Sequence, residues 1–113
     1  MVHIALPSPI GMDSISRPGY YATTGVPLLI NKLCNKFGCL KGELMIHIYG
    51  GADSIYKNDI FNIGKRNIEA VNYVLSSLNL KVYHADVGGT LSRTIEIAVE
   101  DGDIKITRQP IRI

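Results

Sequence analysis

The chain has 113 residues, of which 46% are hydrophobic and 19% are charged, as expected for one globular domain with a single core. Its formal net charge is only +2 and its Lys and Arg residues are scattered, which argues against a nucleic-acid partner. No apolar stretch reaches the roughly 18 residues of a membrane span. We therefore expect one cytoplasmic domain over residues 1–113, without membrane insertion.

The first third of the chain predicts a strand followed by a helix. Val2 to Leu6 is an apolar run of the kind found in buried strands. From Thr24 to Phe37 the apolar positions recur in steps of three and four, which predicts a helix with one apolar face. Thr23 or Thr24 is expected to cap its start, and Gly38 is expected to stop it in the left-handed conformation.

The remainder of the chain predicts a second helix among several strands. Apolar side chains recur on one side of residues 64–78, and Asn79 is expected to end this helix because Asn tolerates the left-handed conformation. Strands are predicted at Leu44–Tyr49, Lys81–Ala85, Thr94–Val99 and Ile104–Thr107, the last two forming a hairpin. This order predicts an α+β domain, with two main helices packed against mixed or antiparallel sheet.

Three glycine motifs stand where hydrophobic runs change period. They are Gly50-Gly51-Ala52, Ile63-Gly64-Lys65-Arg66-Asn67 and Asp86-Val87-Gly88-Gly89. One Gly-Gly pair indicates only a turn, and the Lys-Ser/Thr of a phosphate loop does not follow the last motif. Taken in this order with His3-Ile4-Ala5-Leu6-Pro7, however, the motifs resemble the chemoreceptor glutamine deamidase family, the CheD proteins of chemotaxis. The resemblance runs from His3 to about Ile106.

The resemblance implies a fold and an activity. The fold is a CheD-like cysteine hydrolase with its active site at a sheet edge, here lacking the family's N-terminal segment. The activity is hydrolysis of glutamine side-chain amides on methyl-accepting chemotaxis receptors. In that chemistry a thiolate attacks the amide carbon, and an imidazole takes the thiol proton and returns it to the departing ammonia. No cofactor and no metal is implied.

The resemblance also implies the site residues. His3 stands in the place of the imidazole that acts as general base, although a lone His in an apolar strand is more often structural. Substrate binding is assigned to Tyr21, Gly50, Gly51, Arg66 and Asn67. Arg66 and Asn67 could instead anchor the loop before their helix, and this second interpretation is favoured because a glycine-rich approach suits tight backbone packing.

The nucleophilic cysteine is missing from this sequence. In the family it belongs to a Gly-Ser-Cys motif that precedes the histidine, and only Met1 and Val2 precede His3 here. Cys34 lies on the apolar face of the first helix and is expected to be buried as a small hydrophobe. Cys39 follows the helix stop, and neither position offers the cationic or helix N-terminal setting of a reactive thiol. Both are expected to be reduced and non-catalytic.

Two functions therefore stay open. The first is a receptor deamidase whose cysteine-bearing segment is absent from this sequence, through truncation or a misassigned start codon. The second is a catalytically inactive CheD-like module that binds chemotaxis proteins, either receptors or a CheC-type phosphatase. His47 and His84 are expected to be packing or surface groups, because three separated histidines without Cys, Asp or Glu at metal spacing predict no metal site.

Overall fold

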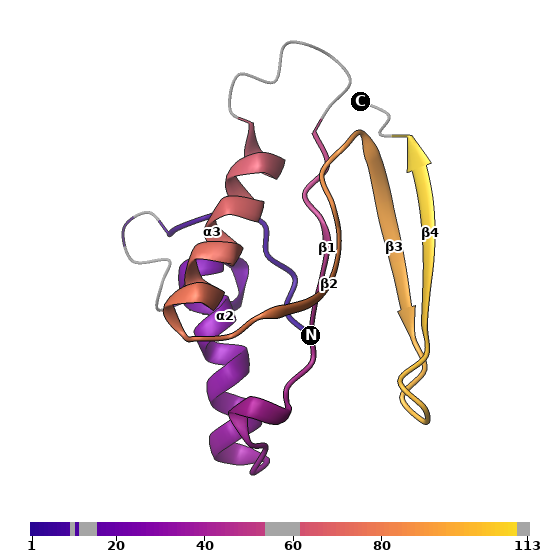
Figure 1. The fold of residues 1–113 in the computed structure, drawn as a ribbon. Helices are drawn as coiled ribbons and strands as arrows, with labels where there is room; N and C mark the ends of the chain where they lie inside the picture. Colours follow the sequence, from indigo (N-terminus) through magenta and orange to yellow (C-terminus); the bar gives the residue numbers. More distant parts are fainter. Residues whose placement is uncertain (10, 12–15, 54–61, 111–113) are drawn as a thin grey trace.

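The computed structural model describes residues 1–9, 11, 16–53 and 62–110, and it combines two main helices with four strands (Figure 1). In chain order they are η1 (Pro18–Tyr20), α2 (Ala22–Asn31), the π-helical turn η2 (Lys32–Lys36), η3 (Lys41–Glu43), β1 (Ile46–Gly50), α3 (Ile63–Ser77), β2 (Val82–Val87), β3 (Leu91–Ile97) and β4 (Ile104–Pro110). The predicted α+β class is confirmed.

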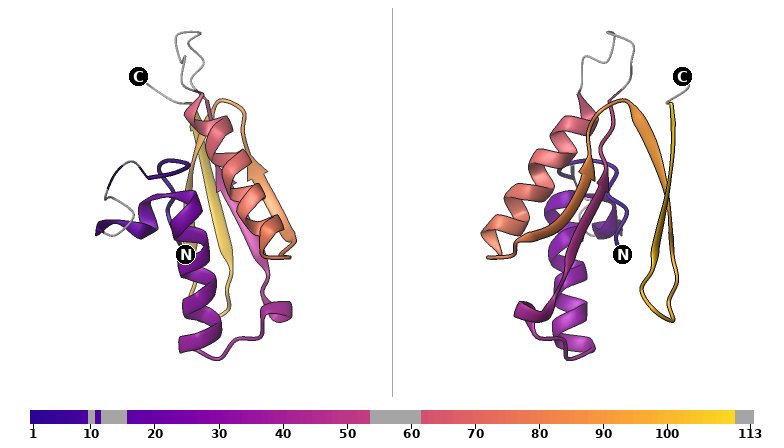
Figure 2. Two further views of the ribbon diagram at one scale, coloured as in Figure 1. Left: turned by 90° about the vertical axis from the view of Figure 1, so that its left-hand side faces the viewer. Right: turned by 45° about the vertical axis from the view of Figure 1, so that its right-hand side comes forward.

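The strands form two small sheets, with both helices on one side (Figures 1 and 2). Strands β1 and β2 pair in parallel, and α3 is the crossover between them. Strands β3 and β4 form the predicted antiparallel hairpin, which stands on the side of β1 and β2 away from α2 and α3. The β1–β2 pair is therefore the central layer.

The core lies where the predicted apolar faces of the helices meet. Five buried residues form it: Val26 and Ile30 of α2, Val74 and Leu75 of α3, and Leu80. Ile46, Ile48 and Val82 of the central strands pack against this cluster. The helical periodicity of the sequence thus identified the four helical members of the core, whereas Phe37, at the end of the predicted apolar face of the first helix, is 67% exposed.

The two helix stops are confirmed, but the predicted cap of the first helix is wrong. Gly38 and Asn79 both have positive φ angles, of 72° and 57°. Helix α2 begins at Ala22, so Thr23 lies inside its first turn. Its amide donors do not need a side-chain cap, because the carbonyl of Leu6 accepts the N–H of Ala22 and the carbonyl of Pro7 accepts that of Thr23.

The strand predicted at Val2 to Leu6 is not formed. Its only ladder contact in the described part of the chain is a single parallel bridge between Leu6 and Tyr21, supported by a 2.9 Å bond from the N–H of Ala5 to the carbonyl of Tyr20. A longer strand does not form because the segment lies beside the turn between η1 and α2, where Tyr21 is the one extended residue before the helix begins. A ladder needs several extended residues on both sides.

Two of the glycine motifs are in direct backbone contact. A Cβ atom on Gly64 would lie 2.4 Å from the carbonyl oxygen of Gly51 and 2.6 Å from that of Ala52. A Cβ atom on Gly51, whose φ angle is 66°, would lie 2.5 Å from Cγ1 of Ile68. The end of β1 and the start of α3 can approach this closely only because both positions lack a side chain.

Substitution Gly64→Ala should therefore destabilise the protein. The new methyl group meets backbone oxygens, which cannot rotate away, so we expect a loss of about 1–3 kcal/mol in the free energy of unfolding. Urea denaturation followed by circular dichroism measures it. Gly42→Ala is the matched control, because a Cβ atom there meets no described atom within 4 Å. Equal stabilities of the two variants would refute the close-packing argument.

Candidate active site

The third glycine motif joins the other two at one point. The N–H of Gly88 donates to the carbonyl of Gly50 at 2.9 Å, and the N–H of Asp53 donates to the carbonyl of Gly89 at the same distance. The ends of β1 and β2 and the start of α3 thus meet in a cluster of residues 50–53, 64 and 88–89, which we call the glycine junction. The three motifs that are separate in the sequence form one structural unit.

One guanidinium group holds the glycine junction together. Nη1 of Arg93 donates to the carbonyls of Gly88 at 2.7 Å and Leu91 at 2.8 Å, and it lies 3.5 Å from the carbonyl of Gly50. Its Nη2 donates to Oδ1 of Asp86 at 3.2 Å, and the side chain is 7% exposed. The rigid fork of Arg satisfies carbonyls at chain turns where a regular ladder has stopped.

Asp86 bridges two arginines. Its second carboxylate oxygen accepts from Nε of Arg108 at 3.0 Å, and Nη2 of Arg108 also contacts it. The hydrogen bond from Arg108 is the main reason why the pKa of Asp86 lies below its ordinary value of 3.8; Arg93 acts in the same direction, while desolvation opposes the shift. The charged carboxylate ties both strands of the hairpin to β2.

This network should make stability depend on acid pH. A lowered pKa in the folded state means that the unfolded state binds more protons in acid, so the contribution of Asp86 is complete above pH 3.8 and is lost as pH falls through the lower folded pKa. Asp86→Asn should flatten this part of the stability profile, measured by urea unfolding between neutral and strongly acidic pH. Glu96→Gln, an exposed position on β3, is the control and should leave the profile unchanged.

His3, the predicted general base, lies on an anchored segment with its side chain exposed. Its neighbours Val2 and Ile4 both reach the space that a side chain on Gly25 of α2 would fill. Nδ2 of Asn67 donates to the carbonyl of Ala5 at 3.0 Å and ties the segment to α3. The imidazole is thus presented to solvent from a backbone held on both helices.

The other predicted site residues fall into two groups. Gly51, directly after β1, packs against the start of α3, and Asn67, in the second turn of α3, contacts the His3 segment. Arg66, one residue before Asn67, is exposed. Tyr21 is only 2% exposed, forms the backbone bridge with Leu6, and has its ring edge-on to that of Tyr20. The start of α3 brings most of the set together.

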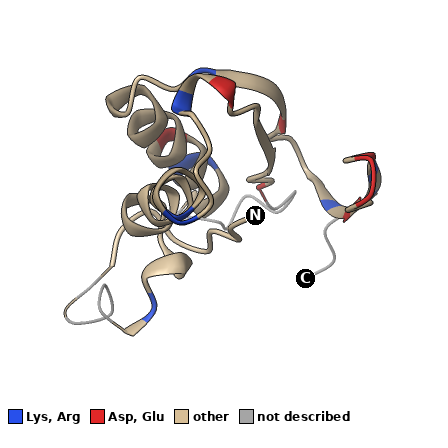
Figure 3. Ribbon diagram, turned by 90° about the horizontal axis from the view of Figure 1, so that it is seen from below, with Lys and Arg blue, Asp and Glu red and all other residues tan. Residues whose placement is uncertain are grey.

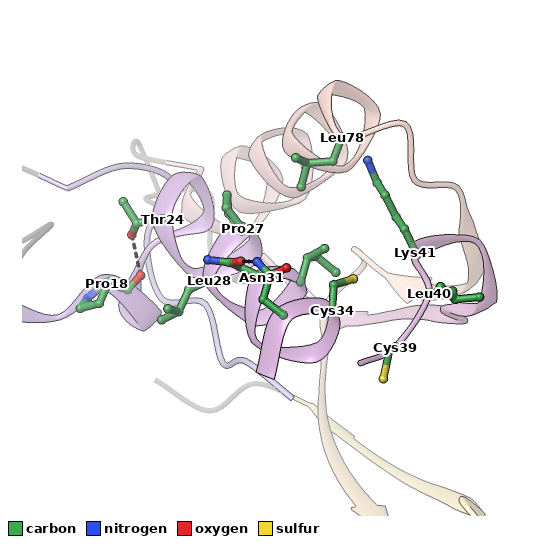
Figure 4. Close-up of a pocket in the computed structure, with 12 residues that line it drawn as sticks. Pro18, Thr24, Pro27, Leu28, Asn31, Cys34, Cys39, Leu40, Lys41 and Leu78 are labelled. Carbon is green, nitrogen blue, oxygen red and sulfur yellow. Dashed lines mark hydrogen bonds between the residues drawn. The ribbon is translucent and has the colours of Figure 1, made fainter. Parts of the chain in front are cut away.

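The two cysteines are free thiols and line a groove of about 660 Å³ (Figure 4). The groove runs between α2, the loop around Leu40 and the end of α3 at Leu78. Cys34 is half-buried and packs against the core cluster, so its expected burial is only partial. The N–H of Cys39 donates to the carbonyl of Leu33 at 2.9 Å, which closes the end of the helix.

Two features escaped the sequence analysis. Arg108, which carried no motif, completes the carboxylate bridge. His47 and His84, treated there as separated, face each other across β1 and β2, a pairing that no local pattern signals.

No group of three or more His, Cys, Asp and Glu in the described ranges could hold a metal ion. Lys and Arg are spread over several elements (Figure 3), and no described helix is long and apolar enough to cross a membrane.

Asn67→Ala should loosen the His3 segment without unfolding the protein. The change removes the hydrogen bond to the carbonyl of Ala5, at a cost of about 1 kcal/mol, and amide hydrogen exchange over residues 2–6 should accelerate. Asn72→Ala, exposed on the same helix, is the matched control. Unchanged exchange in Asn67→Ala would show that this bond does not hold the segment.

Comparison with known proteins gives a consistent result. The family described as CheD chemotactic sensory transduction matches residues 5–108. A protein of Syntrophotalea carbinolica is 40% identical over 111 residues, 95% of this chain and 68% of the relative. A protein of Clostridium botulinum (strain Alaska E43) is 37% identical over 107 residues, covering 92% of this chain and 65% of its own length.

An archaeal relative, from Methanococcus vannielii, is 37% identical over 109 residues, 96% of this chain and 70% of the relative. All three relatives are named probable chemoreceptor glutamine deamidase CheD. The chain spans about two thirds of the length of these relatives. The matched region contains all three motifs of the glycine junction and the anchor between Asn67 and Ala5, and the chain therefore belongs to the CheD family.

Proposed function

We propose that this chain provides the general base and part of the substrate surface of a chemoreceptor glutamine deamidase. The observation that carries the proposal is the exposed His3 on a segment fixed by Asn67 to the start of α3. A general base must be accessible to its reaction partners and held in one orientation. The names of the relatives supply the substrate class, glutamine side chains of chemoreceptors.

Neither cysteine of the chain can serve as the nucleophile. The His3 segment packs against Gly25, and Cys34 follows nine residues later on the same helical rod. At a rise of 1.5 Å per residue, Gly25 and Cys34 are about 13 Å apart along the helix axis, far beyond hydrogen-bond reach. Cys39 lies farther along the chain, beyond the helix end. The reaction therefore needs a thiolate from another segment placed beside His3.

The mechanism follows from that arrangement. His3 takes the proton of the incoming thiol, and the thiolate attacks the carboxamide carbon of the glutamine. The imidazolium then returns the proton to the leaving ammonia, and water assisted by the same imidazole hydrolyses the thioester to glutamate. Arg66, exposed one residue before the anchor Asn67, and the backbone at Gly50 and Gly51 are the proposed substrate contacts.

A chimera tests the proposal. The residues that precede the matched region in the Syntrophotalea carbinolica relative, with the Gly-Ser-Cys motif expected there, are joined to His3 of this chain. Peptide mass spectrometry of a chemoreceptor cytoplasmic fragment should then reveal glutamine converted to glutamate. His3→Ala in the chimera should lower the rate by about 100-fold or more, whereas Cys34→Ser should leave it unchanged. A rate independent of His3 would refute its role as general base.

The exposed Arg66 beside the anchor Asn67 also suits a second candidate, a binding module without catalysis. Such a module would bind a receptor or a CheC-type phosphatase through the same surface. A folded chimera without activity, together with binding of the 113-residue chain to either protein in a pull-down that Arg66→Ala weakens, would support this candidate over the enzyme. Deamidation by the chimera would decide for the enzyme.

A further inference from the structure

The central sheet has one face on the core and another face that carries imidazoles. Ile46 and Ile48 of β1 pack against the core cluster, so the alternate residues His47 and Tyr49 point to the opposite face. On β2 the register pairs Ile46 with Val82 but His47 with His84. One extra residue, Tyr83, is therefore accommodated by a bulge, and the bulge places His84 opposite His47.

The two imidazoles are close enough to share one ligand. Their ring centroids are 5.8 Å apart, with 52° between the ring planes. Two imidazoles on one tetrahedral metal ion, each with a metal–nitrogen distance of about 2.1 Å, have centroids about 5 Å apart. A small rotation of the exposed His84 side chain removes this difference. Neither strand has to move, because the half-buried His47 already lies opposite His84 in the strand register.

The surroundings orient His47 for coordination. Its Nδ1 lies 3.0 Å from the hydroxyl of Tyr49. Histidines that bind metals normally use their second nitrogen for such an outer hydrogen bond, which fixes the ring and leaves Nε2 for the metal. The ring of Tyr83 lies 5.4 Å from that of His47 and limits its movement. Asp86, on the same sheet, is committed to Arg93 and Arg108 and is not a further ligand.

We propose that His47 and His84 form a two-imidazole site for a divalent transition-metal ion, with water completing the coordination. Imidazole ligands suit Zn²⁺, Ni²⁺ and Cu²⁺, whereas Mg²⁺ and Ca²⁺ require oxygen ligands. The bound ion would link β1 to β2 across the bulge. Because it would bind the folded state and not the unfolded state, it would also raise the free energy of unfolding. The site lies outside the proposed deamidase machinery and does not depend on that function.

Calorimetric titration of the 113-residue protein with Zn²⁺ alone tests the proposal. We expect one ion per chain, and an affinity at least about tenfold lower in His84→Ala, which removes an exposed side chain and should fold normally. Tyr49→Phe should weaken binding by about tenfold through loss of the outer hydrogen bond. His3→Ala, which keeps both ligands, is the control and should bind as the unaltered protein does.

The thiols offer a competing explanation that a second measurement separates. The double variant Cys34→Ser, Cys39→Ser should bind Zn²⁺ with unchanged affinity, and Co²⁺ bound to the unaltered protein should lack the thiolate charge-transfer bands in the near ultraviolet. Zn²⁺ should also raise the melting temperature of the unaltered protein but not of His84→Ala. Binding that survives in folded His84→Ala, that is lost in the cysteine variant, or that is absent altogether would overturn the proposal.

Discussion

The hydrogen bonds of Arg93 are the interaction on which the rest of the structure depends. Strands β1 and β2 both end in glycine pairs with positive φ angles, so their terminal carbonyls turn out of the ladder and need donors. The backbone N–H groups of Gly88 and Asp53 supply two of these donors, and the guanidinium of Arg93, almost fully buried and neutralised by Asp86, supplies the others. Removal of the guanidinium would take the side-chain donor from the carbonyls of Gly88 and Leu91 and leave Asp86 with Arg108 as its remaining partner. This explains why an Asp, two glycines and an Arg occur within eight residues.

The glycine junction also determines where the candidate site lies. Because Gly64 lies directly against the carbonyls of Gly51 and Ala52, the first turn of α3 packs closely on the end of β1. Asn67, three residues later, is then directed at the carbonyl of Ala5. The segment that carries His3 is thus held by a helix whose own position depends on backbone packing at the glycine junction. Because glycines lack side chains, they contribute to the candidate site through the close backbone packing that positions the start of α3.

The central sheet combines two different environments. Its helix-facing side is aliphatic and supplies the hydrophobic stabilisation. Its other side carries two tyrosines and two histidines, and each ring lies within about 6 Å of at least one other. A bulge in β2 separates the two patterns and lets His84 join the second side. The polar aromatic face is therefore available for a role that the core-facing residues cannot have.

The sequence by itself determined the helices, their stops at Gly38 and Asn79, the hairpin, the α+β class and the family, because these depend on local periodicity, on glycine conformation and on ordered motifs. Tertiary structure alone decided the rest. It capped α2 with the carbonyls of Leu6 and Pro7, reduced the expected first strand to one bridge, and paired His47 with His84. Each of these contacts joins residues distant in the chain, and a local pattern does not specify the partner that such a contact requires.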